Sequence, residues 1–217
     1  MNYAFTNGKI LNGNKDMQLQ EGLCILVQDD KIIDIVPDTT DLHDYKRIDL
    51  HGHYILPGLI NMHVHLAGNG KPQKKQRDNE KLVNTIMSSA LTRAVAYKMV
   101  SGFAKTELLS GVTTIRTVGG LGSFDTRLRD EIEVGAKIGP RILASNQGIS
   151  VPGGHMAGSV AIAAATIPDE LDHLEKSKEE KVDLIKLMIT GGVMDAKEKG
   201  VPGELKMSPE MVRAVCE

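Results

Sequence analysis

The stretch "LINMHVHLAGNG" (residues 59–70) places two histidines, His63 and His65, at the end of an apolar run that follows Pro57 and Gly58. Alternate residues of a strand project to the same side, so both imidazoles would point together, roughly 6–7 Å apart at the backbone. Two imidazoles on one face can bind the same metal ion, and zinc commonly takes histidine nitrogen. The alternative is an ordinary polar end of a buried strand.

The chain contains a second pair with the same spacing, His51 and His53, which precedes Pro57 and Gly58. We expect these two to be polar residues of a turn. What distinguishes His63 and His65 is their context, because an apolar strand leads into them and the glycine-rich stretch "AGNG" (67–70) follows. Context, and not spacing, therefore favours the later pair as metal ligands.

The first 57 residues are typical of a small β unit. "GLCILV" (22–27) and "KIIDIV" (31–36) are rich in β-branched residues, and the polar stretch "QDD" (28–30) between them predicts a hairpin turn. A further strand-like stretch, "RIDLHGHYILPG" (47–58), ends at the Pro-Gly pair. We expect residues 1–57 to form part of a composite β domain.

From residue 58 onward, expected strands and helices alternate along the chain. Strands are predicted at 59–65, 112–118, 141–145 and 182–189, and helices at 79–110, 125–139 and 168–181, with a last helix starting at Ser208 and Pro209. Such alternation implies parallel strands joined by crossover helices. A (β/α)₈ barrel takes roughly 250 residues. The predicted fold class is therefore α/β: residues 58–217 form the first four βα units of a TIM-type barrel, after a small N-terminal β unit.

Composition excludes several classes of partner. The 217 residues contain 26 Lys plus Arg and 28 Asp plus Glu, a net charge of -2, which gives no electrostatic case for nucleic acid or an anionic membrane. The short basic run "KPQKKQR" (71–77) is interpreted as a solvated loop. Cys24 and Cys216 are the only cysteines, so no disulfide framework is expected. No signal peptide or long apolar span appears, so we expect a cytoplasmic protein.

Lys186 interrupts "LIKLMI" (184–189), a run otherwise suited to a buried strand. A buried lysine needs a paired charge, a shifted pKa or a chemical modification. The alternatives are that Lys186 extends toward the strand end or pairs with an acid such as Asp183.

His155 lies in "SVPGGHMAG" (150–158), a loop expected at the C-terminal ends of the strands, where barrel enzymes bind ligands. Gly153 and Gly154 would let the backbone approach a ligand closely. The alternative is a histidine in a mobile loop. His43 and His173 are expected at the surface.

Four stretches, in order, carry a family resemblance. "LPGLINMHVH" (56–65) strongly resembles the entry to the barrel in the amidohydrolase superfamily. "GVTTIRTVGG" (111–120), "GPRILASNQGISVPGGHM" (139–156) and "DLIKLMITGGVMD" (183–195) resemble the branch with imidazolonepropionase-related hydrolases and prolidase-like dipeptidases. The similarity covers essentially the whole chain.

The resemblance implies roles for the candidate residues. His63 and His65 match the two ligands of the more buried metal, and Lys186 matches a lysine that is carboxylated and bridges two divalent ions, usually zinc. His155, next to Gly154, matches a residue that helps to hold the polar group of the substrate. The metal pair would activate a water molecule and polarise the scissile carbonyl of an amide.

The chain departs from the family pattern after Lys186. Family members normally add two histidines from later strands and an aspartate that acts as general base and acid. No histidine follows His173. Asp195 is the only later aspartate, and nothing assigns it that role. The catalytic aspartate is therefore expected to lie beyond this chain, which by itself would be inactive.

The resulting prediction is a metal-dependent amidohydrolase that cleaves an amide or peptide-like C–N bond of a dipeptide or an N-acyl amino acid. The 121 residues between His65 and Lys186 favour the prolidase-like branch. A cyclic-amide hydrolase resembling imidazolonepropionase or dihydroorotase is the alternative enzyme, and a non-catalytic half-barrel binding or assembly module is the alternative of another class. We expect the chain to oligomerise or to require the C-terminal half of the barrel.

Overall fold

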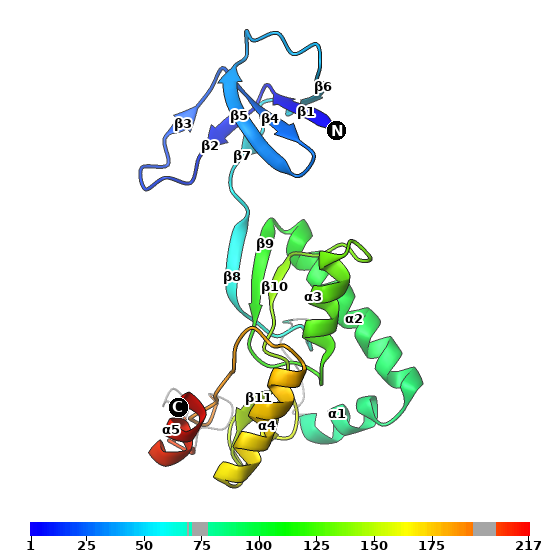
Figure 1. Cartoon of the computed structure of the whole chain (residues 1–217), viewed down its shortest axis with the longest axis vertical. Coiled ribbons are helices and arrows are strands. Elements are labelled where there is room, and N and C mark those ends of the chain that lie inside the picture. The colour runs from blue at the N-terminus through cyan, green and yellow to red at the C-terminus, as the bar shows by residue number, and fades with distance from the viewer. Residues whose placement is uncertain (69, 71–77, 193–202) are drawn as a thin grey trace. The chain divides into compact units, whose positions relative to one another are not determined.

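The computed structural model describes residues 1–68, 70, 78–192 and 203–217 (Figure 1). The basic run 71–77 and Asp195 lie outside these residues. The chain divides into two compact units, Met1–Gly58 and Leu59–Glu217. The division falls directly after Pro57 and Gly58, where the sequence pattern changes.

The first unit is made of two small sheets. The strands are β1 (Asn2–Thr6), β2 (Lys9–Leu11), β3 (Leu19–Gln20), β4 (Leu23–Gln28), β5 (Lys31–Pro37), β6 (Lys46–Asp49) and β7 (Tyr54–Ile55). One sheet has the order β5-β4-β1-β6 and the other β3-β2-β7. The predicted hairpin is confirmed: β4 and β5 pair antiparallel, and Asp29 enters the turn with a φ of 55°.

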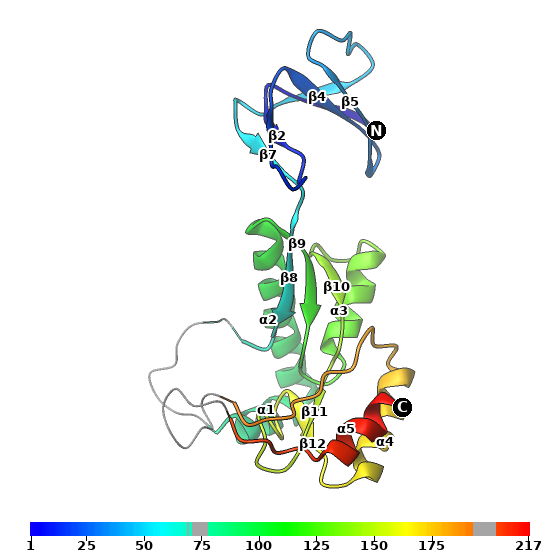
Figure 2. The same ribbon diagram turned by 90° about the vertical axis from the view of Figure 1, so that its left-hand side faces the viewer.

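The second unit begins with a parallel sheet of order β10-β9-β8, made of β8 (Leu59–Val64), β9 (Val112–Thr117) and β10 (Arg141–Leu143). Helices α1 (Asn79–Met87) and α2 (Ala90–Leu109) connect β8 to β9, and α3 (Phe124–Glu133) connects β9 to β10. Figure 2 shows α2 and α3 beside these strands. The fold is therefore mixed α/β.

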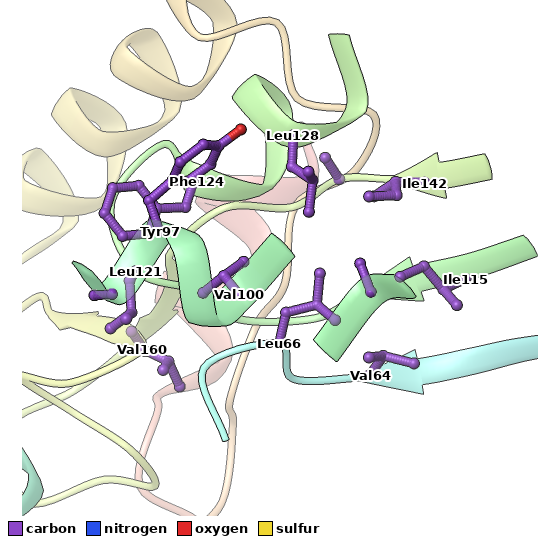
Figure 3. Packing of buried hydrophobic residues seen from close by; sticks show 14 of the residues in the cluster. Val64, Leu66, Tyr97, Val100, Ile115, Leu121, Phe124, Leu128, Ile142 and Val160 are labelled. Atoms are coloured by element: carbon purple, nitrogen blue, oxygen red, sulfur yellow. The ribbon is translucent and has the colours of Figure 1, made fainter. Parts of the chain in front are cut away.

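The core of the second unit lies between the parallel strands and the helices. Val64, Ile115 and Ile142 come from the three neighbouring strands and pack with Val100 of α2 and Leu128 of α3 (Figure 3). Each is at most 7% exposed. Because side chains alternate along a strand, the residues next to Val64 project away from this core.

Two helix predictions need correction. The region 79–110 forms two helices, because Ser89 is extended (φ -130°) and its side chain caps α2 by accepting from the Thr92 N–H. The helix expected over 125–139 ends at Glu133, and Gly135 follows in a left-handed conformation (φ 73°). Gly111 follows the C-terminal end of α2 with a φ of 93°, a conformation that glycine adopts readily after a helix.

The C-terminal part of the chain differs most from expectation. Two short parallel strands, β11 (Gly148–Ser150) and β12 (Ala161–Ala163), were not predicted. The expected strand over 182–189 was wrong, since this segment forms a single bridge from Leu187 to Ile149. Helices α4 (Ile167–Glu179) and α5 (Pro209–Cys216) follow the prediction, with Ser208 capping α5.

Helix α4 buries a polar face. Glu170, His173 and Ser177 are each at most 7% exposed, so the prediction that His173 lies at the surface was wrong. Its Nε2 lies 3.1 Å from the carbonyl oxygen of Gln147, which satisfies the buried ring. None of the helices in the described ranges has the length and apolar character needed to cross a membrane.

Candidate active site

His63 and His65 lie at the C-terminal end of β8, on either side of the buried Val64. Their ring centroids are 5.2 Å apart with an interplanar angle of 67°. His63 is exposed and His65 is half-buried. The two imidazoles are therefore close enough to act on one ligand.

A backbone carbonyl fixes the orientation of His65. Its Nδ1 lies 3.0 Å from the oxygen of Gly119, just beyond β9. With Nδ1 as the donor, Nε2 remains available as a metal ligand. Gly119 has a φ of 130°, and a Cβ there would lie 3.3 Å from His65 Cε1 and 3.2 Å from the Val160 oxygen. The close packing of His65 therefore requires glycine at this position.

Buried polar side chains hold the backbone of Gly119 in place through hydrogen bonds. Its N–H donates to the Ser145 hydroxyl (2.9 Å), and the Ser145 N–H donates to the Thr117 hydroxyl (3.2 Å). The carboxyl of Asp125 lies against Gly120, where a Cβ would come within 2.5 Å of Oδ2. Burial raises the pKa of Asp125 to about 6, and a hydrogen bond from Thr117 opposes this shift. A buried carboxyl with a raised pKa thus packs against the turn that contacts His65.

The charge environment favours a neutral His63. Partial burial lowers the pKa of His63, and the positive charges of Lys186, His65, Arg116 and His155 lower it further, in that order. The neutral imidazole is the form that binds metal. The other three predicted candidates, His65, His155 and Lys186, therefore all act electrostatically on His63.

Lys186 lies where the chain runs beside β11. Its carbonyl accepts from the Ile149 N–H (2.8 Å), and its Cγ would lie 3.2 Å from a Cβ on Gly148. The alternative of a Lys186–Asp183 pair is wrong, because Asp183 binds Arg129 at 2.8 Å. Lys186 makes no ion pair with any residue of the described ranges. Its amine is therefore not committed to a carboxylate within them.

The loop after β11 has a compact start. Gly154 donates its N–H to the Val151 oxygen (2.8 Å), and a Cβ on Gly154 would come within 2.6 Å of the Ser150 hydroxyl oxygen. That hydroxyl is buried and has no hydrogen-bond partner within the described part of the chain. Gly154 therefore lets the loop fold tightly just before His155. The positive charge of His155 contributes to lowering the pKa of His63.

The earlier histidine pair has a different environment. His51 has a φ of 50°, and its N–H donates to an oxygen of Asp49 (2.7 Å). His53 Nδ1 lies 2.7 Å from the Leu50 oxygen. Both are exposed, which confirms the prediction that His51 and His53 are polar residues of a turn.

A cavity of about 380 Å³ lies beside the candidate ligands. His63 and His65 line it together with Phe103, Thr106 and Glu107 of α2. Across residues 1–68, 70, 78–192 and 203–217, no three His, Cys, Asp or Glu side chains cluster as a metal site. A structural or catalytic zinc needs three or four protein ligands, so the two histidines need additional ones.

Sequence reasoning missed three residues that contact these ligands. Asn61 lies two residues before His63, and its side chain accepts from the His63 N–H (3.2 Å). Arg116 donates from Nε to the Met62 oxygen (2.8 Å). Gly119 contacts His65 as described. Arg116 could have been found, because it interrupts the β-branched run "VTTIRTV" (112–118) as Lys186 interrupts its own.

The sequence model of the amidohydrolase family matches residues 54–217. The chain belongs to this family. The match covers the whole second unit, so the histidines, Lys186 and the loop with His155 all lie within the amidohydrolase region.

Solved structures resemble this amidohydrolase chain over nearly its full length. A putative prolidase from Bifidobacterium longum is 32% identical with a TM-score of 0.73, over 99% of this chain and 46% of the other. A Xaa-Pro dipeptidase with bound methionine in its active site is 27% identical with a TM-score of 0.74, over 100% of this chain and 53% of the other. The amidohydrolase chain therefore spans about half the length of these structures.

A curated relative matches a shorter part. The dihydroorotase of Bacillus thuringiensis (strain Al Hakam) is 36% identical over 75 residues, which are 35% of this chain and 17% of that protein. The match is more local than the likeness to the two solved structures.

Proposed function

We propose that this chain supplies part of the binuclear metal site of an amidohydrolase that cleaves an amide or peptide-like C–N bond of a dipeptide or N-acyl amino acid. The observation that carries the proposal is the pairing of His63 and His65 at the end of β8, where their ring centroids lie 5.2 Å apart beside a cavity of about 380 Å³. The charges of Lys186 and His155, which lie 123 and 92 residues from His63 in the sequence, also act on His63.

The residues fit a divalent metal. His63 is held neutral, and His65 has its Nδ1 occupied by Gly119, so each can offer a ring nitrogen. Within the described residues the Lys186 amine makes no ion pair, and carboxylation would turn it into an anionic oxygen ligand suited to zinc. The metal pair would lower the pKa of a water molecule and polarise the substrate carbonyl. His155, on the loop that Gly154 allows to turn tightly, would bind the polar group of the substrate.

The substrate class rests on the comparisons. A prolidase-like structure at 32% identity covers 99% of the chain, which favours a dipeptide. The 36% match to a dihydroorotase favours a cyclic amide, the second candidate. The match to the dipeptidases is broader and extends from the first histidine pair to beyond Lys186, so we place the dipeptide first.

The architecture of the second unit supports a partial barrel. Three parallel strands with crossover helices between them are the repeating unit of a (β/α)₈ barrel. The segment around Leu187 bridges in parallel to β11 and would correspond to the fourth strand. We propose that a further half, in the same or a second polypeptide, completes the barrel and supplies the remaining ligands and the general base.

Metal titration tests the site. Zinc binding by the 217-residue chain, followed by calorimetry, is expected to weaken at least tenfold in His63→Asn and His65→Asn. His51→Asn and His53→Asn are matched controls with the same spacing and should bind like the wild type. Equal losses from both pairs, or from neither, would contradict the assignment.

Lysine carboxylation and substrate class need separate tests. With zinc and ¹³C-bicarbonate, the complete polypeptide should show a carbamate carbon signal that Lys186→Met lacks. The same protein should hydrolyse Xaa-Pro dipeptides or N-acyl amino acids faster than dihydroorotate. Preference for dihydroorotate would favour the second candidate, and metal binding without turnover of any amide would favour a non-catalytic module.

A further inference from the structure

Strand β8 contains one extra residue between Asn61 and Val64, in the segment that holds Met62 and His63. Asn61 is opposite Ile115, and Val64 is opposite Thr117, so three steps along β8 match two steps along β9. A register shift of this kind is a β-bulge, which bends the strand and changes the direction of a side chain. The bulge therefore falls between Asn61 and Val64, at the candidate ligand itself.

The bulged peptide group receives its hydrogen bonds from side chains. The Met62 oxygen accepts from Arg116 Nε at 2.8 Å. The N–H of the same peptide bond belongs to His63 and donates to Asn61 Oδ1 at 3.2 Å. Backbone polar groups in a folded chain need partners, and here two side chains replace the partners that a regular strand would supply.

We infer that Asn61 and Arg116 are positioning residues: they fix the bulged Met62–His63 peptide and so set the direction of the His63 imidazole toward His65. The inference rests on the proposed metal site. It assigns no contact between either residue and the substrate. The orientation of the His63 imidazole would therefore depend on the side chain of Asn61 in β8 and the side chain of Arg116 in β9.

The residue types suit this role. Asparagine has a short side chain whose oxygen can reach the N–H two residues ahead. Arginine holds its Nε–H in a rigid plane, so one hydrogen bond to Met62 also restricts the guanidinium. Lysine could replace that donor and keep the positive charge near His63, whereas methionine would fill similar space and supply no donor.

Paired variants test the inference. In Arg116→Met and Asn61→Ala, Co²⁺ affinity is expected to fall about tenfold, the range seen when groups that orient a ligand are removed, and the visible Co²⁺ spectrum should change. Arg116→Lys and Asn61→Ser, which keep a donor or an acceptor, should recover most of the affinity. Arg141→Met, at an exposed arginine of β10, is the matched control and should behave like the wild type.

A second measurement uses the metal-free chain. The ¹⁵N and ¹H ring shifts of His63, observed by long-range NMR correlation, should move in Arg116→Met and Asn61→Ala, and remain close to wild type in Arg116→Lys and Arg141→Met. Comparison with Arg116→Lys separates the lost hydrogen bond from the lost charge.

The outcomes distinguish the two proposals. Lower thermal stability in Arg116→Met with unchanged Co²⁺ affinity, spectrum and His63 shifts would mean a purely structural role and would overturn the inference. If the wild-type chain binds no Co²⁺ through His63 and His65, the proposed metal site fails. The ring shifts of the metal-free chain then decide the positioning role alone: movement supports it and constancy overturns it.

Discussion

Asp125 combines burial with an unsatisfied oxygen beneath the turn that holds His65. It is 1% exposed, and its Oδ2 has no hydrogen-bond partner among the residues that the structure describes. Removing a carboxylate from water disfavours its charged form. Burial therefore favours the protonated form of Asp125, and its carboxyl fills the space against Gly120.

This residue should make stability depend on pH. The pKa of Asp125 rises from 3.8 to about 6 in the folded chain, so the native state retains a proton that the unfolded state has lost. Stability should therefore fall as pH rises from about 4 to about 6, by on the order of 3 kcal/mol, and then level off. Urea unfolding across this range should show a shallower decline in Asp125→Asn.

The comparison isolates Asp125 from other acids. Burial, followed by the charge of Asp169, also raises the pKa of Glu170, but that contribution is common to the wild type and the variant. Identical pH slopes for the two proteins would show that Asp125 does not titrate in this range.

Helices α2 and α3 are joined by a polar contact at the edge of the core. Tyr97 donates from its hydroxyl to Glu131 Oε2 at 2.7 Å. The guanidinium of Arg127 lies over the Tyr97 ring, 3.9 Å from its centroid. The aromatic ring itself is buried against Phe124, so the hydroxyl can be removed without emptying the core.

We expect Tyr97→Phe to destabilise the chain by about 1–2 kcal/mol, because it deletes a hydrogen bond to a charged group and leaves the ring packing intact. Chemical denaturation would measure the change. A double-mutant cycle with Glu131→Gln should give a coupling energy above about 0.5 kcal/mol. Additive effects would mean that the contact contributes nothing to the joining of the two helices.

Local sequence signals predict where a helix begins and ends better than they predict which strands pair with each other. Ser208 and Pro209 start α5, and Gly111 ends α2, because caps act within a few residues. The three-residue strands β11 and β12 are too short to show a pattern. The apolar run 182–189 fits a strand, but a strand also needs a neighbour, and only Leu187 bridges to β11.

For the candidate active site too, the sequence predicts local features but not contacts between distant residues. The spacing and context of His63 and His65 could be predicted from their own segment. The contacts that orient them could not, because Gly119 and Arg116 each lie 54 residues from their partners. His173 was misplaced because the face of α4 that it shares with Glu170 is polar, so hydropathy gives no sign of burial.

For the molecule as a whole, an exposed apolar stripe on α2 is a surface through which the chain could associate. Leu91, Val95 and Met99 recur every four residues of α2 and are 76%, 55% and 55% exposed. Residues at this spacing lie on one side of a helix. Contiguous apolar surface of this kind favours association with another protein surface.

The 217-residue chain is therefore expected to self-associate at micromolar concentration. The double substitution Val95→Glu and Met99→Lys should shift it toward the monomer in sedimentation velocity runs over a concentration series. Lys98→Glu changes a polar residue that is also exposed on α2 and serves as the control. Unchanged association in the double variant would exclude the stripe as the contact surface.

The long-range pairing of strands sets an order of events during synthesis. β1 and β2 pair with β6 and β7, so the first unit is complete once the chain has emerged through Ile55. β8 can pair with β9 only after 53 more residues have been synthesised, because Leu59 pairs with Val112. At about 5–20 residues per second, this takes roughly 3–10 s. During that interval the apolar residues of β8 lack their partner strand and are accessible to chaperones. His63 and His65 also lack the contacts from β9 and Gly119 that orient them.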